Sequence, residues 1–232
     1  MHLSIILPTY NEKKNIFILI NLLKKKIPNS IKKEIIVVDD NSEDRTYYLL
    51  KKKFNNNKIV KLILRKKDKS LGKSVGKGVS IAKGKLILVM DVDLSHNPSD
   101  IVKLISFTKN YDLVSCSRYL DLGNMENKIH FYLSYFYNIF LRLFLGTKVY
   151  DNTGGFFCIK RKVLRKLPQK KIFFGYGDYF FRLLFFLKNS GGSIIEIPTI
   201  YKSRVYGKSK SRFLIMAIKY FLSALKLKLN LN

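Results

Sequence analysis

The chain has 232 residues, of which 47% are hydrophobic, and this is enough for one α/β domain with a full core. Its net charge of +28 predicts an anionic partner, such as nucleic acid, anionic lipid or a phosphorylated substrate. Tryptophan is absent, and Phe and Tyr are spread through apolar segments, which argues against a stacking platform for nucleic acid.

Short apolar runs alternate with helical patterns over the first 118 residues. The apolar runs predict strands at 4–7, 34–38, 59–64, 86–90 and 113–117. Between them, apolar residues at helical spacing predict helices at 16–27, 43–53, 72–83 and 99–109. This alternation predicts an open, mostly parallel sheet flanked by helices. Neither an internal repeat nor a linker is visible, so we expect one main domain.

Two aromatic, amphipathic segments follow, at 128–146 and 212–229. The sequence allows two interpretations of these segments. In the first they are helices that cover the sheet. In the second they are helices that lie in a membrane interface, with basic residues at anionic headgroups. The last acidic residue is Glu196, so the second segment lies in a purely basic tail. We expect a main domain at 1–211 and a C-terminal amphipathic helix at 212–232.

The two cysteines, Cys116 and Cys158, each lie in an apolar, strand-like run. We expect them to be buried, reduced thiols of a cytosolic protein. The N-terminal segment lacks the long apolar stretch of a signal peptide, and no run of about 18 apolar residues exists. We therefore expect no membrane-spanning helix.

Asp91 and Asp93 follow directly after the apolar run 86–90. Side chains two residues apart on an extended segment point the same way, so the two carboxylates can converge on one cation. Ligands bind at the carboxyl ends of strands in open α/β sheets. Paired carboxylates suit Mg²⁺ or Mn²⁺ held together with substrate phosphates. The alternative for such a pair alone is a solvated turn.

Polar residues also follow the first two predicted strands. Tyr10 can stack on a base, and Glu12 can accept a hydrogen bond from a base or a ribose. Asp39 and Asp40 end the second strand, where an acid suits a ribose or a base. Helix capping is the simpler explanation for these polar residues.

Gly72-Lys73-Ser74 does not form a phosphate-binding loop, because position 67 is Lys where that motif needs Gly. The segment opens a helix instead, and we expect its glycines to allow close approach to a donor substrate.

The motifs together resemble those of the GT-A, family 2 inverting glycosyltransferases. This likeness rests on segments 8–12, 38–42, 90–96 and 117–119. Segments 151–156 and 204–210 are similar to the dolichol-phosphate mannosyltransferase, or polyprenyl-phosphate glycosyltransferase, branch of that family. The likeness covers about residues 3–211. It implies a GT-A (Rossmann-like) fold with Mg²⁺ or Mn²⁺ as cofactor.

The resemblance also implies roles for individual residues. The nucleotide sugar would be bound by Pro8, Tyr10, Glu12, Asp39, Asp40, Asp91 and Arg204. The metal would be bound by Asp91 and Asp93, and the acceptor phosphate by Arg118 and Ser134. The residues closest to catalysis would be Asp93, Arg118 and Arg204. Family members usually carry an Arg shortly before Ser134, and here the nearest match is His130.

The implied reaction is inverting transfer of a hexose, most simply mannose, from a nucleotide sugar to a polyprenyl phosphate at the cytoplasmic membrane face. GDP-mannose is the favoured donor and UDP-glucose the second. The implied partners also include an anionic membrane surface, to which the protein binds peripherally, and exclude nucleic acid. One alternative is a sugar-hydroxyl acceptor with Asp178 as the base. Another is a non-catalytic, basic membrane- or nucleic-acid-binding protein.

Overall fold

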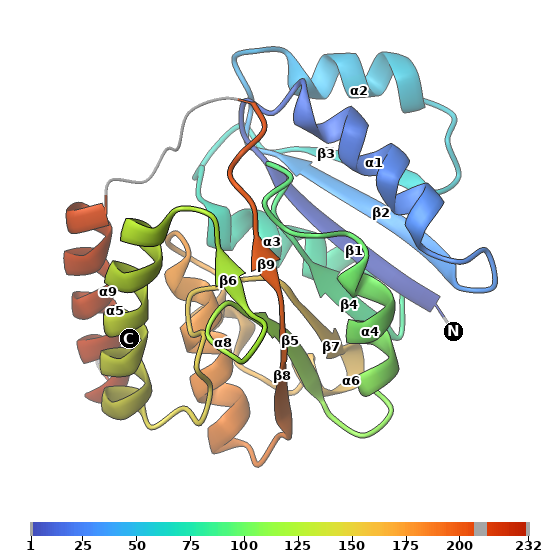
Figure 1. The fold of residues 1–232 in the computed structure, drawn as a ribbon. Coiled ribbons are helices and arrows are strands. Elements are labelled where there is room, and N and C mark those ends of the chain that lie inside the picture. Colours follow the sequence, from blue (N-terminus) through green and yellow to red (C-terminus); the bar gives the residue numbers. More distant parts are fainter. Residues whose placement is uncertain (1, 207–212, 231–232) are drawn as a thin grey trace.

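The computed structural model describes residues 2–206 and 213–230, and it has a central seven-stranded sheet with helices on both faces (Figure 1). The spatial order of the strands is β3-β2-β1-β4-β7-β5-β8. All neighbouring strands are parallel except β7, which is antiparallel to both β4 and β5. The strands are β1 His2–Thr9, β2 Lys32–Asp39, β3 Val60–Leu64, β4 Leu86–Val89, β5 Leu113–Ser117, β7 Phe157–Lys160 and β8 Ile194–Pro198. A separate two-stranded sheet pairs β6 Asn124–Met125 with β9 Ile200–Tyr201.

Nine helices lie within the described residues. They are α1 Asn15–Lys26, α2 Thr46–Phe54, α3 Leu71–Ile81, α4 Asp100–Phe107, α5 Lys128–Leu145, α6 Arg161–Leu164, α7 Gln169–Ile172, α8 Asp178–Asn189 and α9 Phe213–Lys228.

Helices bury both faces of the sheet. Successive side chains of a strand point to opposite faces, so they enter two different cores. On β1, Ile5 and Leu7 pack in one core with helices α1, α2 and α4, whereas Ile6 packs in a second core with α3 and α8. Each of these side chains is fully buried. This packing fixes the backbone at the carboxyl ends of β1, β2 and β4. Polar side chains that follow these strand ends can therefore be held in place.

Helices α5 and α9 lie side by side and cover α8 rather than the sheet itself (Figure 1). Leu141 and Leu145 of α5, Phe181 of α8, and Ala224 and Leu227 of α9 form a third buried cluster. The inner face of α9 is thus packed on protein.

The predicted α/β class, the five predicted strands and the predicted helices are all present, with ends that differ by a few residues. The reversed strand β7 was not predicted, because a four-residue apolar strand carries no sign of its direction. Cys116 and Cys158 lie on β5 and β7 as buried free thiols, as expected.

We expected the α3 glycines to allow close approach to a donor substrate. In the structure another segment of the chain, residues 173–175, lies against them instead. A Cβ on Gly72 would overlap the backbone of Phe174, and a Cβ on Gly76 would lie 2.6 Å from the Cβ of Phe173. The amide of Gly72 also donates to the carbonyl of Gly175 at 3.0 Å. These glycines therefore bring the loop after α7 against α3.

The variant Gly72→Ala should lower the free energy of unfolding by about 1–3 kcal/mol, because its methyl group must displace a packed backbone. Urea denaturation of the purified protein measures this difference. Ser80→Ala, at an exposed position of the same helix, is the control and should change the free energy by less than about 0.5 kcal/mol. Equal stability of the two variants would contradict the close packing of α3 on this loop.

Candidate active site

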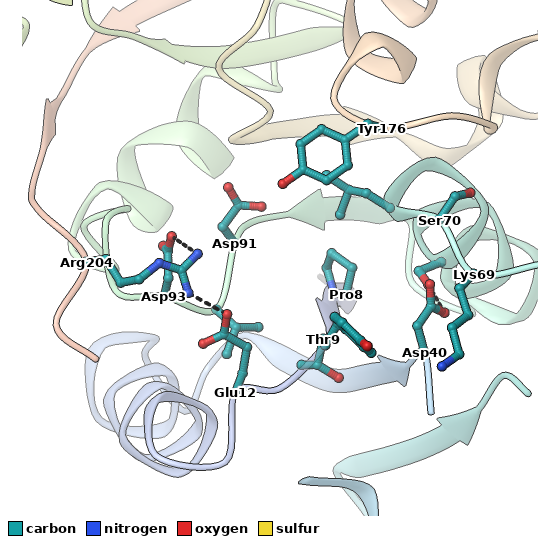
Figure 2. Close-up of a pocket in the computed structure, with 14 residues that line it drawn as sticks. Pro8, Thr9, Glu12, Asp40, Lys69, Ser70, Asp91, Asp93, Tyr176 and Arg204 are labelled. Atoms are coloured by element: carbon teal, nitrogen blue, oxygen red, sulfur yellow. Dashed lines mark hydrogen bonds and ion pairs between the residues drawn. The ribbon is translucent and has the colours of Figure 1, made fainter. Parts of the chain in front are cut away.

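A cavity of about 480 Å³ opens at the carboxyl ends of β1, β2 and β4 (Figure 2). Residues from several elements far apart in the sequence line it. They are Pro8, Thr9, Tyr10, Glu12, Asp40, Lys69, Ser70, Leu71, Ser74, Asp91, Val92, Asp93, Tyr176 and Arg204. Of the predicted donor-site residues, the structure brings all but Asp39 to this cavity.

One end of the cavity contains Asp40, Lys69 and Tyr10. The carboxylate of Asp40 accepts hydrogen bonds from Arg65 at 2.6 Å and from Ser74 at 2.5 Å. Burial raises the pKa of Asp40, and these two partners oppose the rise. The ammonium group of Lys69 lies 5.4 Å from the centre of the Tyr10 ring. This end therefore offers an aromatic face, a cation and hydrogen-bonding groups for a base or a ribose.

Asp39 has a different place from Asp40. Its carboxylate accepts from the amide of Ser42 at 2.9 Å, from the hydroxyl of Ser42 at 2.6 Å and from Thr9 at 3.1 Å. Asp39 is fully buried and holds the turn after β2. The structure thus separates the two neighbouring acids: Asp40 lines the cavity and Asp39 shapes the loop behind it.

Asp91 and Asp93 lie together at the opposite end, after β4. The Asp91 side chain keeps 46% of its surface exposed to the cavity. The walls nevertheless restrict solvation, and this desolvation, with the charge of Asp93, raises the pKa of Asp91 to about 7. Two carboxylates that repel each other in this way fit a divalent cation. Among the described residues no group of three His, Cys, Asp or Glu forms a metal site, so further oxygen ligands would come from the substrate.

His96 closes the floor beneath Asp91. Its ring stacks on Phe156 with centroids 4.8 Å apart, and its Nδ1 accepts from the Asp91 amide at 3.0 Å. Burial lowers the pKa of His96 to about 4, so the imidazole is neutral. Its buried Nε2 has no hydrogen-bond partner among residues 2–206 and 213–230, and it lies 3.8 Å from the Asp91 carboxylate. His96 therefore orients the backbone that presents Asp91.

Arg204 bridges two acids of the cavity. Its guanidinium bonds to Glu12 at 2.6 Å and to Asp93 at 3.0 Å (Figure 2). The side chain remains 22% exposed. Arg204 thus lies at the carboxylate end of the cavity. Residues 207–210, which belong to the segment 204–210 that carries the family resemblance, lie outside the described residues.

Arg118 does not line the cavity. It is 7% exposed, and it makes two bonds of 2.7 Å to the carboxylate of Asp151. A third bond of 2.9 Å reaches the hydroxyl of Thr153. Burial disfavours its charge, but Asp151 outweighs this and raises the pKa of Arg118. Its positive charge still reaches Asp91, where it opposes a small part of the rise in the pKa of that carboxyl.

Ser134 belongs to the same polar cluster. Its hydroxyl accepts from Tyr119 at 2.6 Å and donates to the carbonyl of His130 one turn earlier in α5, also at 2.6 Å. Asn138, a turn further along α5, bonds to Thr153 at 3.1 Å. The structure therefore brings the two predicted acceptor residues, Arg118 and Ser134, into one cluster beside the cavity.

Asp178 is not a free carboxylate. It forms an ion pair with Arg182 one turn along α8, and it accepts from the amide of Tyr176 at 2.7 Å. It does not line the cavity, so its geometry disagrees with a role as catalytic base. Sequence reasoning missed Tyr176 and Lys69 as cavity residues. The flanking glycines of Gly175-Tyr176-Gly177 were the only signal, because they indicate a turn that displays its central residue.

Asp91→Asn should stabilise the metal-free fold at alkaline pH. The folded pKa of about 7 exceeds the usual value of about 3.9, so wild-type stability falls as the pH rises from about 4 to 7. The advantage of the variant should therefore grow between pH 5 and pH 8, to a rise in Tm of at least about 2 °C. Melting curves in a chelator measure it, with the exposed Asp121→Asn as control. An advantage equal at both pH values would contradict the raised pKa.

Comparisons with known proteins identify the family of this chain. The model of the family described as Glycosyl transferase family 2 matches residues 4–168. The chain is 32% identical over 216 residues to the dolichol-phosphate mannosyltransferase of Pyrococcus furiosus, covering 90% of this chain and 59% of that protein. It is 31% identical over 136 residues to the polyprenol monophosphomannose synthase of Mycolicibacterium smegmatis, covering 56% and 51% of the two chains.

A third relative, the undecaprenyl-phosphate mannosyltransferase of Micrococcus luteus, is 29% identical over 216 residues, covering 90% of this chain and 87% of that protein. Among solved structures, the glucosyl-3-phosphoglycerate synthase of Mycobacterium tuberculosis, in complex with Mn²⁺, UDP and glucosyl-3-phosphoglycerate, has the same fold. Its TM-score is 0.73 at 18% sequence identity, and 97% of this chain and 79% of that chain are covered. The family match spans most of the chain and all the strand-end acids described above. The chain therefore belongs to glycosyl transferase family 2.

Proposed function

We propose that the protein is an inverting glycosyltransferase that moves a hexose, with mannose favoured, from a nucleotide sugar to a polyprenyl phosphate. The observation that carries the proposal is the cavity in which Asp91, Asp93, Glu12 and Arg204 meet at the carboxyl edge of the sheet. The names of the three relatives, all polyprenyl- or dolichol-phosphate mannosyltransferases or mannose synthases, support it.

The residues of the cavity fit the two parts of a nucleotide sugar. Tyr10, Asp40 and Lys69 would bind the nucleoside. Asp91 and Asp93 would hold Mg²⁺ or Mn²⁺, which neutralises charge on the leaving diphosphate. Arg204 would bind the same diphosphate through charge-assisted hydrogen bonds.

The acceptor phosphate would bind beside this end, near Arg118 and Ser134. A phosphate monoester is already an anionic nucleophile near neutral pH, so no strong base is required. One of its oxygens attacks the anomeric carbon, the bond from that carbon to the donor diphosphate breaks, and the nucleoside diphosphate leaves. The ion pair of Asp178 with Arg182 disfavours the alternative, a sugar-hydroxyl acceptor with Asp178 as base.

Turnover assays test this proposal directly. Purified protein with Mn²⁺ and GDP-mannose should release GDP when a polyprenyl phosphate is present, and much less with an oligosaccharide acceptor. UDP-glucose is the second donor to try, because uracil and guanine are bound through similar strand-end acids. Release with oligosaccharides alone would favour the hydroxyl-acceptor alternative. No release and no nucleotide binding would favour the non-catalytic alternative.

A lipid acceptor requires access to a membrane, and α5 and α9 offer a surface for it. Within residues 2–206 and 213–230, no helix has the length and apolar character needed to cross a bilayer. Large apolar side chains are nevertheless exposed on both helices. They include Ile129, Tyr132, Leu133, Phe136, Ile139 and Leu143 of α5 and Ile215, Ile218, Phe221 and Leu222 of α9. With Lys128, Lys219, Lys226 and Lys228 nearby in sequence, this surface suits peripheral binding to an anionic membrane, at its cytoplasmic face.

Phe136→Glu and Ile218→Glu should each weaken binding to vesicles that contain anionic lipid by roughly tenfold, because each removes a large apolar group from the interface. Vesicle co-sedimentation measures the bound fraction, and added salt should weaken it without abolishing it. Tyr48→Glu is the matched control: Tyr48 is 58% exposed but lies on α2, away from α5 and α9 (Figure 1). Equal loss in the control would show that the effect comes from charge alone.

A further inference from the structure

The turn between α7 and α8 presents one side chain to the cavity, that of Tyr176. The side chain is 40% exposed and lines the cavity wall. In Figure 2 its phenol oxygen points toward the end where Asp91 lies, away from the end with Asp40 and Lys69. A phenol in this place can donate a hydrogen bond to a ligand held at the carboxylate end.

Arg182 of α8 holds the backbone that leads into this turn. Its Nε donates to the carbonyl of Ile172 at 3.1 Å, and its Nη2 donates to the carbonyl of Phe174. The guanidinium carbon also lies 3.7 Å from the centre of the Phe174 ring. Arg182 has no exposed surface. This buried cation therefore ties the two carbonyls before Tyr176 and the Phe174 ring to α8, which restrains the turn.

Asp178 holds the turn from the other side. Its carboxylate forms an ion pair with Arg182 and accepts from the amide of Tyr176 at 2.7 Å. Gly175 has a φ of +69°, and a Cβ there would lie 2.7 Å from the same carboxylate. Glycine is therefore required before Tyr176, and the carboxylate fixes the backbone from which the phenol projects.

The C-terminal helix α9 is part of this arrangement. The hydroxyl of Ser223 accepts from Arg182 at 2.7 Å and donates to Asp178 at 2.9 Å, so it bridges both members of the ion pair. A Cβ on Gly177 would overlap the hydroxyl of Tyr220, which shows how closely α9 approaches the turn. The helix that exposes an apolar surface on one side thus contacts the donor-site turn on the other.

We propose that Tyr176 recognises the sugar-diphosphate end of the donor through its phenol O–H, and that Ser223 of α9 is a positioning residue for it. The inference rests on the proposed function, because it assumes that a nucleotide sugar binds in this cavity. Helix α9 would then have two roles: it supports the donor-site turn and forms part of the proposed membrane surface. Removing α9 would then impair donor binding even in the absence of a membrane.

Calorimetric binding of two ligands tests the assignment. Tyr176→Phe should weaken binding of the nucleotide sugar five- to twentyfold, while binding of the matching nucleoside monophosphate changes less than twofold. The pairs are GDP-mannose with GMP, or UDP-glucose with UMP, whichever the wild type binds, with Mn²⁺ present. Tyr150→Phe is the matched control, because Tyr150 is 42% exposed and lies outside the cavity.

Ser223→Ala should show the same selective loss, smaller in size, and Ser223→Thr should restore binding because it keeps the hydroxyl. The double variant with Tyr176→Phe should bind no more weakly than Tyr176→Phe alone, since Ser223 acts through that residue. Ser190→Ala, at the end of α8, controls for loss of a serine hydroxyl that contacts only a backbone carbonyl.

Unchanged sugar binding by Tyr176→Phe, or equal losses for both ligands, would overturn the role of Tyr176. Additive losses in the double variant would overturn the role of Ser223. Failure of the wild type to bind any nucleotide sugar would instead contradict the proposed function. The first two results require a wild type that binds, so the two kinds of failure are distinguishable.

Discussion

Asp93→Ala should lower turnover at least about 1000-fold, a loss of about 4 kcal/mol of transition-state stabilisation. Burial opposes the charge of Asp93, but hydrogen bonds from Ser95 and the charge of Arg204 outweigh it and lower its pKa. Asp93 is therefore the ionised member of the carboxylate pair at neutral pH. Without it, a cation would keep one protein carboxylate, that of Asp91, and the oxygens of the diphosphate.

Two measurements check this prediction. Steady-state rates with saturating Mn²⁺ give turnover, and Mn²⁺-dependent binding of the nucleotide sugar should be lost in parallel. Asp93→Asn keeps the shape and the contact to Ser95 but not the charge, so it should be nearly as impaired. Asp121→Ala, an exposed acid outside the cavity, should behave as the wild type. Near-normal turnover of Asp93→Ala in excess Mn²⁺ would refute the metal role.

Arg204→Ala should lower kcat by about 100- to 1000-fold while the Kd of the nucleotide sugar, without acceptor, changes less than about threefold. Arg204 bonds to Glu12 and to Asp93 in the structure. Contacts to a bound diphosphate would replace these bonds, so little net ground-state affinity is gained. The contacts strengthen as negative charge develops on the leaving group, and the loss therefore falls on the chemical step.

Comparison of kcat with the directly measured Kd separates the two effects. Arg204→Lys keeps the charge but loses the two-pronged geometry, and it should recover part of kcat. A loss in Kd as large as the loss in kcat would identify Arg204 as a binding residue that acts equally in the ground state.

Local sequence patterns predicted the elements and the strand-end acids of the cavity, and the family resemblance added Pro8 and Arg204. Asp91 and Asp93 were predictable because strand periodicity and the end of an apolar run are local features. The partners of the predicted residues were not predictable in this way. Arg118 meets Asp151, and Asp178 meets Ser223, across 33 and 45 positions of sequence. Only the packed fold brings those groups together, and it pairs Arg118, the predicted acceptor-phosphate residue, with the carboxylate of Asp151.

The same limit explains Tyr176. The glycines on either side of Tyr176 indicate a turn, but they do not show which part of the molecule the turn faces. Its place depends on the close packing of α3, α8 and α9 around one turn. Sequence therefore predicted the site residues that follow a single strand, such as Asp91 and Asp93. It did not predict Tyr176, whose position depends on the packing of several helices.

The reversed strand β7 has a consequence for how the molecule folds. β4 and β5 are not neighbours, so β5 and β8 join the sheet only through the four residues of β7. The first four strands pair by parallel crossovers within residues 2–89, and they can assemble before β7 leaves the ribosome. The other half must wait for residue 160, and Tyr176 and Arg204 arrive later still. The residues at the Asp40 and Lys69 end of the cavity are thus synthesised first, and the Asp91 and Asp93 end is completed last.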